Sequence, residues 1–174
     1  LDSLGKRIFS PTVRILERPH LLKGFGSTPF DDDGVATRDR DVVEDGVLQG
    51  YFLGCYSARK LGMVTTGNAG GAHNLTLASG NRDFDGMLKL MDRGLLLTEV
   101  LGHGVNYVTG DYSRGAAGFW VENGKIVHPV EEITIAGNLA EMFRGIVESG
   151  ADVFSRGSKQ TGSILIDRMK LAGS

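Results

Sequence analysis

The sequence predicts an α+β fold that is dominated by largely antiparallel sheet, with hairpins and about three inserted helices. Two dipeptides, Asp45-Gly46 and Asn123-Gly124, stand between apolar runs and supply the positive backbone angles that two-residue hairpin turns require. Apolar residues at helical spacing occur only in short windows, and predicted strands and helices do not alternate regularly. Regular alternation would indicate a parallel sheet, so we expect neighbouring strands to pair antiparallel.

The first half of the chain is expected to contain strands, one hairpin and a short helix. The hairpin pairs Val35–Val43 with Val47–Leu53 across the Asp45-Gly46 turn. A helix is predicted over Ser57–Leu61, with Ser57 as its candidate N-cap and Gly62 as its end. Two further strands are predicted at Thr12–Leu16 and Leu75–Ala78.

A second helix is predicted over Asp83–Met91, because apolar residues recur there at spacings of three, four and seven, from Phe84 to Met91. Gly94 is expected to close it. The next segment, Leu95–Leu101, is a continuous apolar run interrupted only by Glu99. We expect this Glu to lie at a sheet edge or in an ion pair, with a functional role as the alternative.

The last third is expected to contain two more strands, a helix and a strand-like tail. Phe119–Val121 leads into the Asn123-Gly124 turn, and Glu132–Ala136 alternates like a half-buried strand. Asn138 is a candidate N-cap for a helix that Gly150 ends, with apolar residues through Ile146 and Val147 on one stripe. The segments Ser163–Ile166 and Met169–Leu171 form the tail.

Composition indicates an ordered protein with many turns rather than a disordered one. The chain has 26 glycines, only four prolines and 41% apolar residues. Its 174 residues are enough for one domain with a real core, so we predict a single domain over residues 1–174. The formal charge of −2 makes direct nucleic-acid binding unexpected. A single cysteine, with no apolar run long enough to span a membrane, favours a cytoplasmic protein without membrane contact.

Two blocks rich in small residues are the candidate functional segments, because bare backbone allows close approach of a strand or a ligand. The alternative is that their residues only satisfy tight turns and one another. The first block lacks the Gly-Lys-Ser/Thr of a nucleotide-binding loop, so nucleotide binding is not expected. The candidate peptide-binding or interface residues are Gly67, Asn68, Gly70, Gly71, His73 and Asn74 in the first block and Asp111, Tyr112, Ser113 and Arg114 in the second.

The longest runs of the chain resemble the C-terminal region of the PmbA family, also called TldE. Gly110–Gly124 and Pro129–Leu139 resemble one part of that region, and Thr66–Leu75 resembles another. Pro19–Gly24 with Ser27–Phe30 resembles a third. These blocks occur in the family's order, so the resemblance covers nearly the whole chain and implies that an N-terminal domain of the family is absent from it.

The resemblance implies a role in a zinc peptidase complex. PmbA-type subunits associate with TldD-type subunits, and the complex trims or degrades small peptides, as in peptide maturation and antitoxin degradation. TldD-type proteins carry a His-Glu-x-x-x-His helix and a C-terminal cysteine. This chain has neither motif, and its segment Arg156–Ser163 offers Ser and Thr where a thiolate would be needed. We therefore expect no catalytic residue, metal ligand or cofactor in this chain, with zinc in the partner subunit.

Under this hypothesis the two blocks form the wall of a peptide groove or a subunit interface, and bare backbone pairs with an extended chain by strand addition. The partner is a TldD-like subunit or a second copy of the chain. Two alternatives remain open. The chain could be a homodimeric peptide-binding module without a catalytic partner, or an indirect modulator of DNA gyrase that acts through peptide processing.

Overall fold

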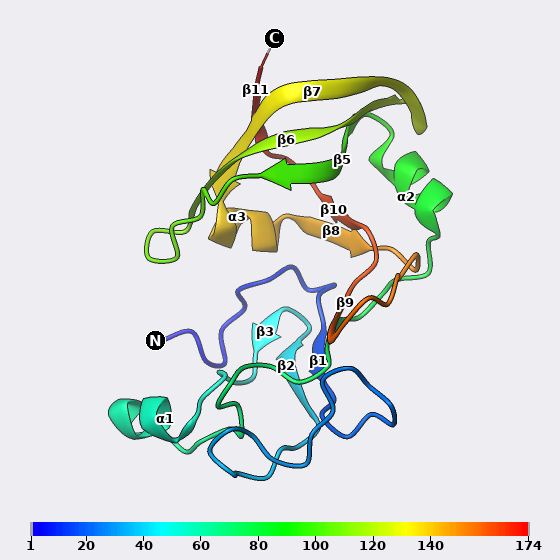
Figure 1. Ribbon diagram of the computed structural model, residues 1–174. Coiled ribbons are helices and arrows are strands. Elements are labelled where there is room, and N and C mark those ends of the chain that lie inside the picture. Colours follow the sequence, from blue (N-terminus) through cyan, green and yellow to red (C-terminus); the bar gives the residue numbers. More distant parts are fainter. Residues whose placement is uncertain (1, 174) are drawn as a thin grey trace. The chain divides into compact units, whose positions relative to one another are not determined.

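The computed structural model describes residues 2–173, which fold into two compact units (Figure 1). The first unit contains the residues up to Ser79 together with Val153–Gly162, and the second contains Gly80–Asp152 and the residues from Ser163 onward. Each unit therefore joins segments that are distant in sequence. The single domain over residues 1–174 stays a prediction.

The first unit is built on a five-stranded sheet with the order β3-β2-β1-β4-β9. Neighbouring strands are antiparallel, except that β4 and β9 run parallel. The predicted hairpin is present: Asp45 and Gly46 have φ angles of 48° and 76°, and they join β2 to β3. The strands are β1 (Ile15–Glu17), β2 (Arg40–Glu44), β3 (Val47–Leu48), β4 (Leu75–Leu77) and β9 (Lys159–Gln160).

The helix of the first unit, α1 (Cys55–Leu61), begins two residues before the predicted start. Ser57 is not its N-cap, because Gly54 occupies that position and the Ser57 hydroxyl donates to the Gly54 carbonyl oxygen at 3.1 Å. The amide of Cys55 instead donates to Asp33 Oδ2 at 2.8 Å. A carboxylate distant in sequence thus satisfies a free N–H of the first turn, which the local pattern could not reveal.

The second unit contains a four-stranded antiparallel sheet with the order β11-β7-β6-β5 (Figure 1). Ala116, Ile133 and Ile135 form a buried cluster on this sheet. The Asn123-Gly124 turn has φ angles of 52° and 68° and joins β6 to β7 as predicted. The strands are β5 (Gly94–Leu101), β6 (Asp111–Glu122), β7 (Lys125–Asn138) and β11 (Lys170–Ala172).

Glycine in the middle of β6 has a steric cause. A Cβ atom added at Gly118 would overlap the carbonyl oxygen of Leu96 on the neighbouring strand β5. The small residues of this segment therefore allow two strands to approach closely, one of the two explanations expected from the sequence. Glu99 is exposed on β5, which is an edge strand of the sheet, as predicted.

Two helices and a two-stranded sheet complete the second unit. The helix α2 (Phe84–Met91) is capped by Asp83, whose side chain accepts from the Gly86 amide at 2.8 Å. The helix α3 (Leu139–Arg144) begins at the predicted N-cap, Asn138. It is shorter than expected, because β8 (Ile146–Ser149) follows it and pairs with β10 (Ile164–Ile166).

The prediction that Ile146 and Val147 continue this helix is therefore wrong. Pairing with a strand from the tail determines their conformation, which overrides the local helical spacing. Figure 1 shows α3, β8 and β10 as a layer beside the four-stranded sheet. The α+β class with mostly antiparallel pairing is confirmed. Within residues 2–173, each helix is too short or too polar to cross a membrane.

Candidate functional site

A buried carboxylate holds the first glycine-rich block in place. Glu17, at the end of β1, is 1% exposed and accepts from Arg40 Nε at 2.7 Å. It also accepts from Asn68 Nδ2 at 2.7 Å and from the backbone amide of His73 at 2.9 Å. The Glu17 carboxylate, on the middle strand of the five-stranded sheet, thus holds the first block near both of its ends, at Asn68 and at His73.

Asn68 has its side-chain hydrogen bonds satisfied within the chain. Its Nδ2 donates to Glu17 and to the Gly71 carbonyl oxygen at 3.1 Å. Its Oδ1 accepts from Arg40 Nη2 at 2.9 Å and from Thr66 Oγ1 at 2.7 Å. An amide can make four such bonds, and all four are present. Asn68 therefore shapes the block, and its side chain has no remaining group for a peptide.

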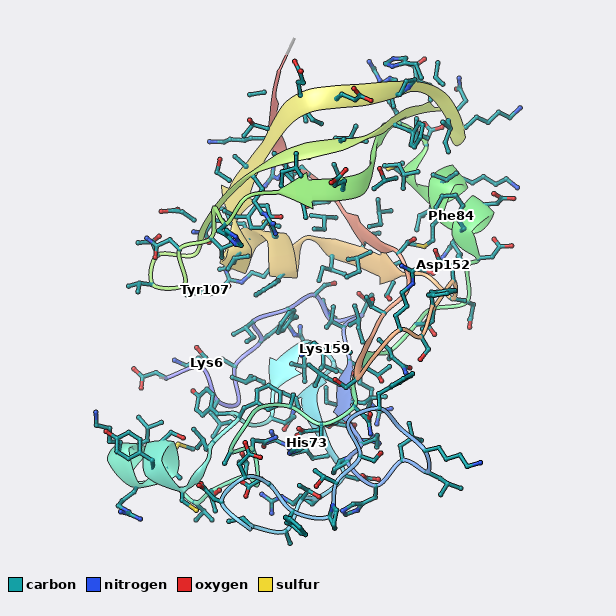
Figure 2. All side chains as sticks on the ribbon, viewed as in Figure 1. Lys6, His73, Phe84, Tyr107, Asp152 and Lys159 are labelled. Carbon is teal, nitrogen blue, oxygen red and sulfur yellow. The ribbon has the colours of Figure 1, made fainter. Side chains whose placement is uncertain are left out.

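The glycines of the first block adopt conformations that disfavour other residues. Gly67, Gly70 and Gly71 have φ angles of 72°, 88° and 118°. A Cβ atom on Gly70 would also overlap the carboxylate of Asp32. The His73 ring nitrogen Nε2 lies 3.2 Å from the Gly67 carbonyl oxygen (Figure 2 labels His73). The block is thus a loop closed on itself by its own polar groups.

Asn74 connects the first block to the loop that follows β1, residues 18–28. Its Nδ2 donates to the Arg18 carbonyl oxygen at 2.9 Å and to Ser27 Oγ at 2.7 Å, and its Oδ1 accepts from the Gly26 amide at 2.8 Å. These three bonds hold a loop whose Leu22 side chain is 87% exposed. Asn74 therefore determines the shape of a surface loop rather than presenting its own amide to solvent.

The acidic turn over residues 31–34 packs against the same block. Asp31 is buried and accepts from the amides of Asp33, Val35 and Ala69 at 3.0, 2.9 and 2.9 Å. Burial raises the pKa of Asp31, but these donors outweigh it and hold the pKa below its ordinary value. Burial and the nearby Asp33 carboxylate raise the pKa of the Cys55 thiol, which keeps it in its unreactive form.

The second block lies on β6 in the other unit, with its four predicted residues divided between two faces. Successive side chains of a strand point to opposite faces, so Asp111 and Ser113 share one face and Tyr112 and Arg114 the other. Asp111 and Ser113 are exposed, whereas Tyr112 packs against the core of this sheet. The first pair is therefore accessible to another chain.

A peptide cannot pair with β6 itself, because this strand already has neighbours on both sides. Residues 111–116 pair with β7, and the Ser113 amide donates to the Gly104 carbonyl oxygen at 2.7 Å. The free edges of this sheet belong to β5 and β11. A peptide that extends this sheet would have to join one of those edges, not the segment for which the sequence predicted it.

Arg114 stabilises the loop between β5 and β6 instead of facing a ligand. Its guanidinium donates to the carbonyl oxygens of Val100 and Gly102. At the tip of this loop, Tyr107 and Val108 are 88% and 95% exposed (Figure 2 labels Tyr107). The loop is ordered by Asn106, whose Oδ1 accepts from the Val108 amide at 2.9 Å. It therefore presents two apolar side chains on a fixed backbone.

The structure thus groups the predicted residues within each block, and the two blocks belong to different units. Sequence reasoning missed Glu17 and Arg40, which organise the first block. The available signal was an acidic residue directly after the apolar pair Ile15-Leu16, a position where an unpaired carboxylate would be costly. Its partners lie 23 and 51 positions away, so spacing alone could not identify them.

The side chains of the described chain do not fit a zinc ion. Protein zinc sites use three or four ligands from Cys, His, Asp or Glu. Within residues 2–173 no three such side chains gather closely enough to hold a metal. His20 Nε2 instead lies 3.1 Å from Thr37 Oγ1, and His73 contacts the Gly67 carbonyl oxygen. No reaction step through a metal is assigned to these residues.

Comparison with known proteins gives a consistent result. The family model of the PmbA/TldA metallopeptidase C-terminal domain matches residues 1–173. Metalloprotease PmbA of Escherichia coli O157:H7 is 57% identical over 173 residues, 99% of this chain and 38% of that protein. A Bacteroides thetaiotaomicron protein described as a modulator of DNA gyrase superimposes with a TM-score of 0.94 at 33% identity, covering all of this chain and 39% of that one.

TldE from Thermococcus kodakarensis superimposes with a TM-score of 0.85 at 25% identity, covering 99% of this chain and 42% of that one. The chain thus spans about two fifths of the length of the relatives it matches. The family model covers residues of both compact units, so both units are part of the family's domain. The chain belongs to the PmbA/TldD metallopeptidase family and corresponds to its C-terminal domain.

Proposed function

We propose that this chain is the C-terminal part of a PmbA/TldE-type subunit that works with a TldD-type subunit in a zinc-dependent peptidase. The complex trims or degrades peptides in the cytoplasm. This chain supplies part of the substrate groove or of the subunit interface and does no chemistry itself. The zinc ion is held by the partner subunit.

The observation that supports this proposal is that the buried carboxylates of the chain, which belongs to a metallopeptidase family, are occupied by internal hydrogen bonds. A general base needs a carboxylate oxygen that is free to take a proton from water or substrate. Glu17 and Asp31 each accept three hydrogen bonds from groups of the chain itself. Such carboxylates stabilise a fold, so the family's chemistry is better placed outside these residues.

Contact with the partner or the peptide falls on the exposed side of the second block and on the adjoining loop. Asp111 and Ser113 are exposed there, and Tyr107 and Val108 project from the loop tip. Tyrosine is one of the residues that most often dominate the binding energy of protein interfaces. The first block contributes through the loop shape that Glu17 and Asn74 maintain.

Substitution of Ser113 by glutamate tests the contact surface. The protein that carries this chain is mixed with a TldD-type subunit, and complex formation is followed by size-exclusion chromatography. The account predicts that Ser113→Glu weakens co-elution and slows cleavage of an unstructured peptide by the mixture. Ser155→Glu, a matched change at an exposed serine of the other unit, leaves both unchanged. Equal behaviour of the two variants, or no complex with the unaltered protein, contradicts the proposal.

A further inference from the structure

We propose that Asn123 is a site of spontaneous deamidation in this protein, and that opening of α2 controls the rate of the reaction. Asn123 is converted into aspartate or isoaspartate through a cyclic imide that it forms with Gly124. The inference is independent of the proposed function, because the reaction needs no partner subunit and no catalyst.

The reaction is fastest where an asparagine is followed by a residue without a side chain. Asn123-Gly124 is the one Asn-Gly pair among the 174 residues, and Asn123 is exposed in the turn between β6 and β7. Another residue would be strained at position 124, where φ is 68° and an added Cβ atom would lie 2.9 Å from the Lys89 Cα atom of α2. The turn therefore requires the glycine that makes cyclisation easy.

The first step is an attack within the turn. The backbone nitrogen of Gly124 attacks the side-chain carbonyl carbon Cγ of Asn123, and a new N–C bond forms. The proton of that nitrogen passes through water to the side-chain amide nitrogen, whose bond to Cγ breaks, and ammonia leaves. Water then opens the five-membered imide at either of its carbonyl carbons. One opening gives aspartate, and the other gives isoaspartate, whose backbone runs through the former side chain.

The folded turn hinders this attack, because the Gly124 amide is already bonded. It donates to the carbonyl oxygen of Asp92, the C-cap residue of α2, at 2.8 Å (Figure 1 shows α2 beside the β6–β7 turn). The bond holds the proton on the nitrogen and fixes the peptide plane. The helix has only eight residues, and isolated helices shorter than about 12–15 residues are marginally stable. We therefore expect α2 to open locally and to release the Gly124 amide each time.

Isoaspartate would make the opening permanent. It adds a carbon atom to the backbone of a two-residue turn across which Glu122 and Lys125 pair directly. Both products also place a new negative charge near the C-terminal end of α2, where the helix dipole disfavours it. The modified turn therefore fits the end of the helix less well than the original turn.

Mass spectrometry measures the reaction on the protein that carries this chain. The protein is incubated at pH 8.5 and digested with trypsin. The peptide of residues 115–125, in which Asn123 is the only amide side chain, is then analysed for deamidation. We expect the folded protein to react at least tenfold more slowly than the free synthetic peptide of the same sequence. Unfolding in urea should raise its rate to that of the peptide in the same urea.

Two N-cap variants in the same unit separate opening of α2 from global unfolding. Asp83→Ala removes the side chain that accepts from the Gly86 amide at the start of α2. It should accelerate deamidation about fivefold, because loss of an N-cap favours opening of a helix by about that factor. Asn138→Ala removes the N-cap of α3, which accepts from the Ala140 amide at 3.1 Å, and should leave the rate unchanged. Circular dichroism checks that both variants are folded.

Three results would overturn the inference. Equal rates in the folded protein and the free peptide would show that the bond from Gly124 to Asp92 does not control the reaction. Equal acceleration by the two cap variants would assign the control to global unfolding. An unchanged rate in folded Asp83→Ala would show that α2 does not gate the turn.

Discussion

Replacing Glu17 by glutamine should destabilise the first unit far more than the loss of an ordinary ion pair. The substitution keeps the shape of the side chain but removes the charge that faces Arg40 Nε at 2.7 Å. The Arg40 side chain is only 13% exposed, so its guanidinium would be left largely buried without a counter-ion. The amide would also place N–H groups where the carboxylate accepts bonds from Asn68 and His73.

The expected loss follows from this burial. Removing one partner of a buried ion pair costs about 3–5 kcal/mol, whereas exposed pairs contribute about 0–1 kcal/mol. Arg40 keeps bonds to the Tyr51 carbonyl oxygen and to Asn68, so we expect the lower figure, about 3 kcal/mol. At a denaturant slope of about 2 kcal/mol per molar urea, the unfolding midpoint falls by roughly 1.5 M.

Urea unfolding followed by circular dichroism measures this loss, and hydrogen exchange of the His73 amide, which donates directly to Glu17, reports it locally. Asp41→Asn is the control in the same sheet. The Asp41 side chain is 17% exposed, but its partners Arg14 and Arg18 are 50% and 33% exposed and can turn to water, so we expect a smaller loss, about 1–2 kcal/mol. If the two variants lose the same stability and the His73 amide keeps its protection, the buried network does not hold the glycine block.

Three further predictions concern a strand contact, a buried acid and a loop clamp. Gly118→Ala should lower stability by about 3 kcal/mol or more in thermal unfolding, because the new Cβ meets the Leu96 carbonyl oxygen, whereas Gly157→Ala has open space and changes little. The ionised Asp31 should contribute its full stabilisation above its ordinary pKa of 3.8 and lose it as the pH falls through the lower pKa of the folded state. The difference in urea midpoint between the original protein and Asp31→Asn should therefore be present at pH 7 and shrink below pH 3.8. Asn74→Ala removes three hydrogen bonds and should lower the free energy of unfolding by about 2–4 kcal/mol. It should also accelerate tryptic cleavage of the loop over residues 18–28, which those bonds hold. A pH-independent Asp31 difference, or unchanged cleavage of the Asn74 variant, would contradict these accounts.

Local signals in the sequence were sufficient for the hairpins and for one helix. The Asp45-Gly46 and Asn123-Gly124 turns both adopt the predicted positive angles, because turn chemistry depends on adjacent residues only. The helix predicted over Asp83–Met91 from its apolar spacing is also present, as α2, with Asp83 as its N-cap. The α3 helix was predicted too long, since the pairing of β8 with β10 joins segments about 17 residues apart and is invisible to a local pattern.

The candidate site could be predicted in part. The glycine-rich blocks were found as segments, and the resemblance of those segments to the PmbA family is confirmed by the match over residues 1–173. The roles of individual side chains depend on partners distant in sequence. Asn68 and Asn74 have internal partners up to 56 residues away, and Arg114 bonds to a neighbouring loop. No spacing rule in the sequence indicates such contacts.

The central proposal, that the zinc ion and the catalytic step belong to the partner subunit, is tested most directly by peptide hydrolysis measured together with zinc content. The protein that carries this chain, a TldD-type subunit and their mixture are each assayed on an unstructured peptide, and zinc is quantified by elemental analysis. The account predicts that the first protein is inactive alone and lacks stoichiometric zinc, while the mixture is more active than the TldD-type subunit alone. Zinc-dependent hydrolysis by the first protein alone, abolished by chelation, would contradict it.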